Sequence, residues 1–306
     1  MEDAILLQRK PRLPYVWIYT FLAPTIVLYG MYTIWPILAT LYYSLLDWNG
    51  FQRSGTFHAL GNYLELFQDQ LFFNSLQVTI MFIVVVVPLR FFLSLGIGLL
   101  LNWNKFRFRS FFRTLIFIPV VTTSAIIGTI MNMVFDPAKG PVNLFLGSLG
   151  LISEHMYFLG SAQTALVTTG IIWGWKWLGT TLIYWIASLQ SIPVELYEAA
   201  KIDGAGPIRS FRSITVPLLY PFAIIIFILT LSDAMRVFDL MLTLTGGGPF
   251  FRTEVIELFI YRWAFSSSIP RLGYASAAAT LFGLFFVVIT LLQLNIQKYS
   301  TRRRAR

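Results

Sequence analysis

Residues 195–219 read ELYEAAKIDGAGPIRSFRSITVPLL and form a polar break in a chain that is otherwise strongly apolar. The segment carries three acidic and three basic side chains, two glycines and a Gly-Pro step. Long apolar runs lie on both sides of it, so it indicates a loop between two apolar spans. The nature of those runs, and the side of them on which the loop lies, determine the fold.

The chain as a whole is poor in charge. Of its 306 residues, 57% are hydrophobic and 12% are charged, whereas soluble domains carry roughly 25% charged residues. So few charged side chains cannot cover a water-facing surface, and lipid is therefore the expected solvent for most of the chain. Cysteine is absent, which excludes a disulfide framework, a thiol nucleophile and a cysteine-based metal site.

Six apolar runs are long enough to cross a bilayer, which takes about 20 residues. Arg90 interrupts the second run and Lys176 the fourth. The first run is too long for a signal peptide and no small-residue cleavage site follows it, so we expect it to be retained. The predicted fold is all-α, an integral membrane protein with six transmembrane helices at 13–46, 70–101, 114–135, 163–189, 213–242 and 272–297.

The basic residues predict the orientation of these helices. They cluster in segment 1–12, in the loops after the second and fourth spans, and in the tail 298–306, whereas the other loops carry few. The positive-inside rule therefore places both termini and the 191–217 loop in the cytoplasm, on either side of a transmembrane domain at 13–297. Segment 233–271 is an exception, with four arginines and four acids, and an even number of spans places it outside. The net charge of +9 is thus a topology signal and not a nucleic-acid-binding surface.

The 191–217 loop has the start and stop signals of a short helix. Pro193 suits a first helical turn, and Glu198 follows where the helix dipole favours negative charge. Gly204 lies where a left-handed residue would end the helix, and the Gly-Pro step at Pro207 then turns the chain into a second short helix. Such a loop is either an interfacial anchor or a docking element, and its acids favour a protein partner over a lipid surface.

This loop also resembles a known motif. The string LYEAAKIDGAGPIRSFRSITVPLL is similar to the EAA loop in the membrane subunits of ATP-binding-cassette (ABC) importers, in the sugar-importing branch related to the maltose permease. Val216 departs mildly from that pattern, which usually has leucine before the final proline. Residues 242–265 resemble the Thr-x-Gly-Gly-Pro segment of such permeases, and residues 59–67 resemble their first outer loop. The resemblance runs from about residue 15 to residue 297.

The resemblance implies a division of labour between chains. This chain has no Gly-x-x-x-x-Gly-Lys-Ser/Thr loop to cradle ATP phosphates, so we expect no enzyme activity and no cofactor of its own, with ATP and Mg on a separate ATPase. The resemblance places the loop helix in a groove of that ATPase. The acids would contact polar or basic groups, the alanines would permit close approach and the glycine would make the bend; the residues are Glu198, Asp203, Ala199, Ala200 and Gly204.

Three further partners follow from the same resemblance. They are a second, homologous permease that completes a heterodimer, a cytoplasmic ATPase dimer, and an extracytoplasmic solute-binding protein that delivers substrate to the outer loops. The expected location is the bacterial plasma (inner) membrane. The ligand would be a sugar or a related polyol or glycoside, since aromatic side chains are abundant, while Lys176 and Arg236 leave a phosphorylated polyol open.

Polar and aromatic residues in the fourth and fifth spans are candidates for substrate contacts. Ionisable residues inside a membrane are functional suspects by default, which selects Lys176, Asp233 and Arg236. Tryptophan faces can stack on sugar rings, and the fourth span holds Trp173, Trp175 and Trp177. The resemblance places the sugar cavity of the family on these two spans and matches Trp175, Leu178, Gly179, Leu182, Thr230, Ala234 and Val237 to it. Related permeases often carry asparagine where this chain has Ala234 and Val237, so contacts there are expected to differ.

Simpler roles remain open for the same residues. Tryptophans in membrane helices often belong to interfacial belts, and Asp233 and Arg236, three residues apart, can pair with each other. Arg90 and Lys176 can snorkel or pair within the bundle. Both histidines, which fall in outer loops, offer no metal constellation.

Two other classes of function are weaker. A stand-alone ion-coupled transporter would be expected to have an inverted repeat between its halves, which the sequence lacks, and it would leave the EAA-like loop without a role. An intramembrane hydrolase would need a Ser/His/Asp or zinc-ligand set within the spans, and none is present.

Overall fold

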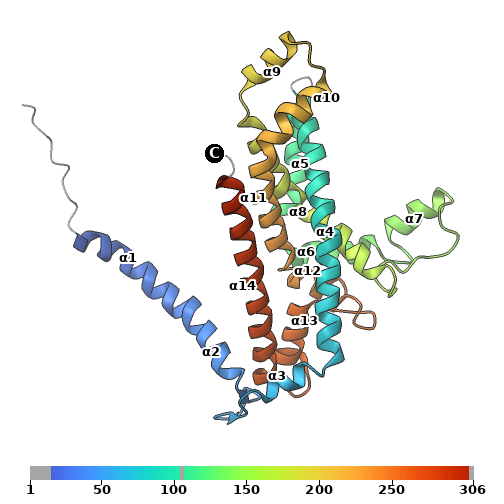
Figure 1. The fold of residues 1–306 in the computed structure, drawn as a ribbon. Helices are drawn as coiled ribbons and strands as arrows, with labels where there is room; N and C mark the ends of the chain where they lie inside the picture. The colour runs from blue at the N-terminus through green and yellow to red at the C-terminus, as the bar shows by residue number, and fades with distance from the viewer. Residues whose placement is uncertain (1–14, 104–106, 303–306) are drawn as a thin grey trace, which may run out of the picture.

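The protein is described by a computed structural model that covers residues 15–103 and 107–302. The predicted cytoplasmic segment 1–12, Lys105 and residues 303–306 of the predicted basic tail lie outside the described residues. The described chain is helical apart from loops and one small hairpin. Most helices form an elongated bundle (Figure 1).

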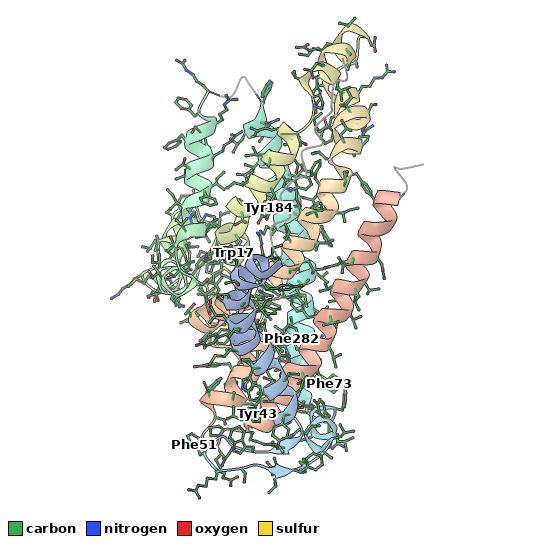
Figure 2. The ribbon with its side chains drawn as sticks, turned by 90° about the vertical axis from the view of Figure 1, so that its left-hand side faces the viewer. Trp17, Tyr43, Phe51, Phe73, Tyr184 and Phe282 are labelled. Carbon is green, nitrogen blue, oxygen red and sulfur yellow. The ribbon has the colours of Figure 1, made fainter. Side chains whose placement is uncertain are left out.

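The first predicted span is a single long helical segment whose N-terminal part stands apart from the bundle (Figure 1), whereas its last helix contacts α14 (Leu272–Arg302). It consists of α1 (Tyr15–Tyr29), the π-helical turn η1 (Gly30–Ile34) and α2 (Trp35–Tyr43). The wider π turn directly precedes Pro36, which has no N–H to donate to the preceding turn. In the view from its own side, Trp17 and Tyr43 mark the two ends of this segment (Figure 2).

A short outer loop links this segment to the bundle. Strands β1 (Leu46–Asp47) and β2 (Thr56–Phe57) pair antiparallel, and α3 (Gly61–Leu66) follows. Glu65 on α3 forms two hydrogen bonds of 2.6 Å with Arg271, directly before α14. The predicted helical spacing of 61–67 is thereby confirmed, and the hairpin is the one departure from an all-helical chain among the described residues.

Two long helices form the middle of the bundle. Helix α4 (Gln70–Asn102) begins at Asp69, whose Oδ1 accepts a hydrogen bond of 2.7 Å from the Leu71 N–H. It packs along α8 (Ala165–Gln190). Their predicted bounds, 70–101 and 163–189, agree closely with these helices. Helix α7 (Pro141–Ser148) lies in a loop that projects away from the bundle (Figure 1).

The third predicted span, 114–135, is broken in the structure. Helix α5 (Arg109–Val121) packs against α8, and α6 (Ser124–Val134) packs against α12. The chain bends by 103° between the two helices, because Thr122 and Thr123 adopt extended backbone angles there. The sequence shows only a run of four β-branched residues (120–123) after Pro119 at this point, so it did not predict the bend.

The remaining helices run from the polar loop to the chain end. Helices α9 (Val194–Ile202) and α10 (Pro207–Ser210) form the loop, and the π turn η2 (Phe211–Thr215) leads into α11 (Val216–Ala234). The predicted fifth span extended to 242, but the helix ends at Ala234 and α12 (Phe238–Leu244) starts after a break. Helix α13 (Ile256–Tyr261), the π turn η3 (Arg262–Ser266) and α14 (Leu272–Arg302) follow.

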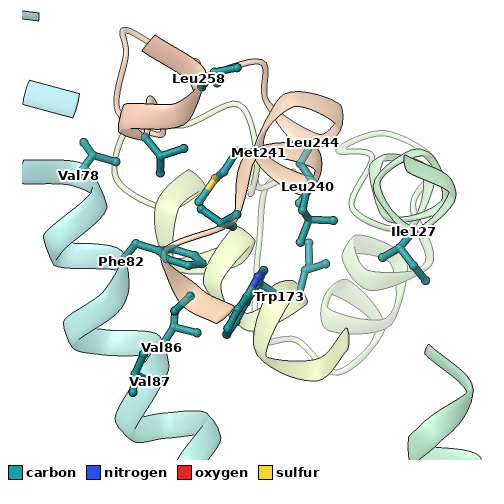
Figure 3. Close-up of a cluster of buried hydrophobic side chains, with 14 residues drawn as sticks. Val78, Phe82, Val86, Val87, Ile127, Trp173, Leu240, Met241, Leu244 and Leu258 are labelled. Atoms are coloured by element: carbon teal, nitrogen blue, oxygen red, sulfur yellow. The ribbon is translucent and has the colours of Figure 1, made fainter. Parts of the chain in front are cut away.

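The largest core cluster lies where α4, α8, α12 and α13 meet (Figure 3). Its central side chains are at most 2% exposed, and they are Phe82 and Val86 from α4, Trp173 from α8, Met241 from α12 and Leu258 from α13. The Phe82 and Trp173 rings meet edge to face with centroids 5.7 Å apart. This cluster fixes α8 and the α11–α12 break relative to α4.

Four of the described helical segments are long and apolar enough to cross a membrane, and a fifth crossing results if the bent α5–α6 pair counts as one span. The four are Trp17–Tyr43, Gln70–Asn102, Pro207–Ala234 and Leu272–Asn295. Helix α8 is not among them, since its tryptophans, glycines, threonines and Lys176 lower its hydropathy. The predicted number of six spans is therefore not established by length and composition.

Candidate coupling loop and translocation pathway

Helices α9 and α10 extend beyond one end of the bundle, opposite the end that holds α3 (Figure 1). Helix α9 begins after Pro193, whose φ of −58° already matches a helix and whose missing N–H costs nothing there. Glu195 lies in the first turn and Lys201 in the last, where each charge interacts favourably with the helix dipole.

The end of α9 agrees with the prediction for Gly204. This glycine has φ +74°, the left-handed conformation that an L-residue adopts only at a cost. The Ala205 N–H donates to the Ala200 carbonyl at 2.8 Å, which is the six-to-one bond of a Schellman ending. The structure therefore contains the helix-ending turn that the sequence predicts at Gly204.

The loop presents charged and apolar side chains to its surroundings. Glu198, Ala199, Asp203 and Gly204 are exposed, and Ala200 is half-buried. Two isoleucines are even more open, with Ile202 87% exposed and Ile208 72% exposed. An apolar tip that extends past the bundle, bordered by acids, has the composition of a protein-docking surface.

The loop is nevertheless firmly joined to the bundle. The Tyr197 hydroxyl and the Thr215 Oγ1 lie 2.8 Å apart, which links α9 to η2. Tyr197 and Ile214 also pack against a buried cluster of side chains from α4, α8, the turn after α8, and α11, namely Phe91, Trp185, Leu189, Ile192, Leu219 and Ile226. Displacement of α9 would therefore be passed to α8 and α11. The sequence analysis missed this link, which depends on a partner 18 residues away.

The predicted substrate residues of α8 do not all point the same way. Lys176 is 1% exposed, and its Nζ lies 3.9 Å from the centre of the Trp177 ring. Leu178 and Leu182 are buried at 7% and 1% exposure. Trp175 is 44% exposed, on an exposed apolar stripe with Val167 and Ile171 at helical spacing.

Gly179 has a close neighbour, but that neighbour is another helix. A Cβ added to it would lie 2.8 Å from the Ile116 carbonyl oxygen and 3.0 Å from the Phe117 Cα, both on α5. The resemblance to sugar permeases placed this glycine at the sugar cavity. In the structure the space is taken by α5, because the two helices pack at close range there.

The predicted residues at the end of α11 are also largely buried. The Thr230 hydroxyl donates to the Ile226 carbonyl of its own helix at 2.7 Å. Ala234 and Val237 are 0% and 2% exposed and belong to the core cluster around Trp173. Within this chain, these three residues therefore face protein.

Asp233 pairs with Arg90 of α4. The Arg90 Nη2 donates to the Asp233 Oδ2 at 3.2 Å, across 143 residues of sequence. Arg236 is exposed, and its guanidinium lies 5.8 Å from the centre of the Phe286 ring. The open alternative of an Asp233–Arg236 pair is thereby corrected, since the Asp233 carboxylate pairs with Arg90 on α4 instead.

Helix α8 also carries a polar stripe, whose member Tyr184 was missed by the sequence analysis. Trp177, Thr180 and Tyr184 follow at helical spacing and are all half-buried or exposed. The Thr180 Oγ1 has no hydrogen-bond partner among the described residues. Figure 2 shows Tyr184 within the length of the bundle and away from its ends. The spacing itself is the signal that could have found Tyr184.

The 242–265 segment is held together by internal hydrogen bonds. Gly246 and Gly247 have φ +58° and +89°. The Arg262 Nε donates to the Glu254 Oε1 at 2.8 Å, and its Nη2 donates to the Gly246 carbonyl at 3.2 Å. Within the residues that the structure covers, no group of three or more metal-ligating side chains comes together.

Comparison with known proteins identifies the architecture. Residues 93–306 match the family described as "Binding-protein-dependent transport system inner membrane component". The chain belongs to this family. Over 281 residues it is 34% identical to a probable ABC transporter permease protein of Bacillus subtilis, YurN, with 92% of this chain and 95% of that protein covered. It is 32% identical to the lactose transport system permease protein LacF of Rhizobium radiobacter, with 94% of both chains covered.

A solved structure supports the same fold. The permease superposes with a TM-score of 0.78 and 22% identity on a chain of a bacterial alginate ABC transporter, determined in complex with an alginate pentasaccharide-bound periplasmic protein, with 94% of both chains covered. The permease is thus an all-α, multi-pass membrane protein and a transport component. Membership of the family decides against the stand-alone ion-coupled transporter.

Proposed function

We propose that this permease is one of two homologous membrane subunits of an ABC importer that carries a sugar or a related polyol or glycoside. The single observation that carries the proposal is the α9–α10 loop, which extends from the bundle and is joined to α8 and α11 through Tyr197. The relationship to a lactose permease and the likeness to an alginate transporter support a saccharide ligand.

In this proposal the loop docks on a separate ATPase dimer that binds ATP and Mg. Glu198 and Asp203 contact polar or basic groups of the ATPase groove, and Ala199 and Ala200 allow close approach. Gly204 makes the bend. The exposure of Glu198, Ala199, Asp203 and Gly204 supports the assignment. When ATP binds, the ATPase dimer closes and moves α9, and the packed cluster passes that movement to α8 and α11. ATP binding thereby shifts the equilibrium between two conformational states of the permease.

The proposed topology has six spans, with both termini on the side of α9 and the solute-binding protein on the opposite side. The placement of α3 and the hairpin at the end away from α9 supports it (Figure 1). Helix α8 counts as a span in this topology. Its polar residues are then shielded by the helices around it, since Lys176 and Thr181 are at most 1% exposed.

The proposed translocation pathway runs beside α8 and the end of α11. Of the ten predicted substrate residues, the three with exposed side chains, Trp175, Asp233 and Arg236, are proposed as direct contacts. The other seven form the packed wall behind them: Lys176, Leu178, Gly179, Leu182, Thr230, Ala234 and Val237.

The test is transport by the reconstituted complex. The permease is co-expressed with its partner permease and ATPase, purified together and placed in liposomes with the binding protein. We expect ATP-driven uptake of at least one compound from a panel of radiolabelled mono- to trisaccharides and sn-glycerol 3-phosphate. A solubilised permease that never carries an ATPase, or uptake driven by an ion gradient without ATP, would contradict the proposal.

A further inference from the structure

Arg90 is a fully buried cation in the middle of a membrane-spanning helix. Its residue exposure is 1%, and one of its donor nitrogens, Nη2, bonds to Asp233. Its Nε and Nη1 have no hydrogen-bond partner within the described part of the chain. Burying a guanidinium away from water costs free energy, and a nearby negative charge is needed to offset that cost.

The surroundings of Arg90 hold it in one place. Its Cζ lies 5.0 Å from the centre of the Trp173 ring, and Trp173 is fixed in turn by its edge-to-face contact with Phe82. Both rings are 1% exposed. The cation is therefore confined between α4 and α8, with its Nη2 directed at the end of α11.

Asp233 occupies the opposite situation. Its side chain is 44% exposed, while the side chain of Arg90 is 0% exposed. Of its two carboxylate oxygens, Oδ2 accepts the bond from Arg90, and Oδ1 has no such partner among the described residues. The pair is thus one-sided, with a hidden cation and a carboxylate that faces outward.

An outward carboxylate oxygen has a specific chemical use. An ionised carboxylate accepts hydrogen bonds and donates none, and hydrogen bonds to it are roughly twice as strong as those between neutral groups. Sugar and polyol hydroxyls are suitable donors. Without a counter-charge, a carboxylate inside a membrane would be too costly to keep ionised.

We propose that Arg90 is a positioning residue of the translocation pathway, which orients the Asp233 carboxylate through the Nη2–Oδ2 hydrogen bond so that its free oxygen accepts hydrogen bonds from the hydroxyls of the passing substrate. Arg90 does not touch the substrate. The inference rests on the proposed function. It adds a residue of the second span to a pathway that the sequence placed on the fourth and fifth.

The experiment separates this role from that of a purely structural ion pair. The variants Arg90→Met, Asp233→Asn and the double variant are prepared in the complete complex with its ATPase and binding protein. Assembly is measured by size-exclusion chromatography, and uptake of the radiolabelled panel is measured per assembled complex. Removing both charges leaves neither group unpaired, so the double variant is expected to assemble like the wild type.

We expect the double variant to lose at least tenfold in maximal uptake rate at unchanged assembly. If the ion pair were only structural, its neutral replacement would leave transport intact. Uptake by the double variant within twofold of wild type would therefore overturn the proposal. Arg90→Lys, which keeps the cation, gives a second reading. Uptake clearly above that of Arg90→Met at equal assembly supports the proposal, and equal uptake of the two variants contradicts it.

Ser94→Ala is the matched control. Ser94 lies one turn from Arg90 on α4, is 0% exposed, and its hydroxyl bonds only within its own helix, to the Phe91 carbonyl at 3.0 Å. Its uptake is expected to stay within twofold of wild type. If the wild-type complex takes up no compound of the panel, the proposed function itself fails and the inference fails with it, which distinguishes that outcome from a failure of Arg90 alone.

Discussion

At the residue scale, one backbone angle controls the shape of the α9–α10 loop. Gly204 adopts φ +74°, and a side chain at this position would be strained by roughly 1 kcal/mol. Nothing lies within 4 Å of its added Cβ, so the strain comes from the backbone alone. A substitution there should change the loop without disturbing the packing of the bundle.

Gly204→Ala is therefore expected to reduce ATP-driven uptake several-fold while membrane insertion and subunit assembly remain intact. Uptake and ATP hydrolysis in liposomes measure the effect. Gly206→Ala is the control, because Gly206 has an ordinary φ of −72° and open space around its added Cβ. Equal uptake by the two variants would show that the loop tolerates a different ending of α9.

The end of α9 and the Arg90–Asp233 pair differ in the sequence separation of the residues that form them. The end of α9 depends on residues within six positions of one another, so Gly204 could be predicted from local rules. The partner of Asp233 lies 143 residues away, and the nearest cation in sequence, Arg236, was the natural but wrong candidate. Local spacing predicts which residues share a helix face, and it says nothing of which other helix packs on that face.

At the scale of elements, α5 and α8 approach each other most closely at Gly179. An added methyl group would meet the backbone of α5 at 2.8 Å, and backbone cannot yield as a flexible side chain can. Gly179→Ala should therefore separate the two helices. The cost of such overpacking is about 1–3 kcal/mol.

We expect Gly179→Ala to lower the apparent melting temperature of the detergent-solubilised complex. Gly174→Ala on the same helix is the matched variant, since nothing lies within 4 Å of its added Cβ. That change should be neutral or stabilising, because alanine restricts the unfolded chain more than glycine does. A melting temperature that is the same for both variants would contradict the close packing.

The break between α11 and α12 shows why the end of the fifth span was misplaced. The apolar pattern continues past Ala234, so periodicity predicted a helix to 242. In the structure the first N–H of α12, on Phe238, donates to the Glu257 Oε2 at 2.9 Å. This carboxylate belongs to α13. No pattern within residues 230–242 could predict it, because the capping residue lies on a later helix.

At the scale of the whole molecule, the end of the bundle away from α9 is held by a charged contact between distant segments. Glu65 on α3 and Arg271 before α14 pair across 206 residues. The hydrogen bonds from Arg271 lower the pKa of Glu65 below its ordinary value of 4.5. Because the folded state holds the carboxylate ionised, the pair stabilises the protein fully above that value. The stabilisation is lost as the pH falls through the lowered pKa.

The Glu65→Gln variant should therefore be less stable than wild type near pH 7, and the difference should vanish toward pH 3. Both side chains are more than a third exposed, so the difference is small, below about 1 kcal/mol. Melting curves at several pH values measure it. Glu154→Gln, an exposed acid on another outer loop, should show no such trend, and a difference for Glu65→Gln that grows at low pH would refute the assignment.

The burial of Arg90 also has a consequence for biosynthesis. Arg90 is synthesised 143 residues before Asp233, so α4 must enter the membrane while its cation is still unpaired. One arginine at a helix centre costs about 2.5–3.5 kcal/mol in insertion, and each leucine, isoleucine, phenylalanine or valine returns roughly 0.3–0.6. The 33-residue length of α4 and its many leucine, isoleucine, phenylalanine and valine side chains supply that compensation in advance. The excess apolarity of the second span is thus explained by the order of synthesis, since it carries the helix through the interval before its counter-ion exists.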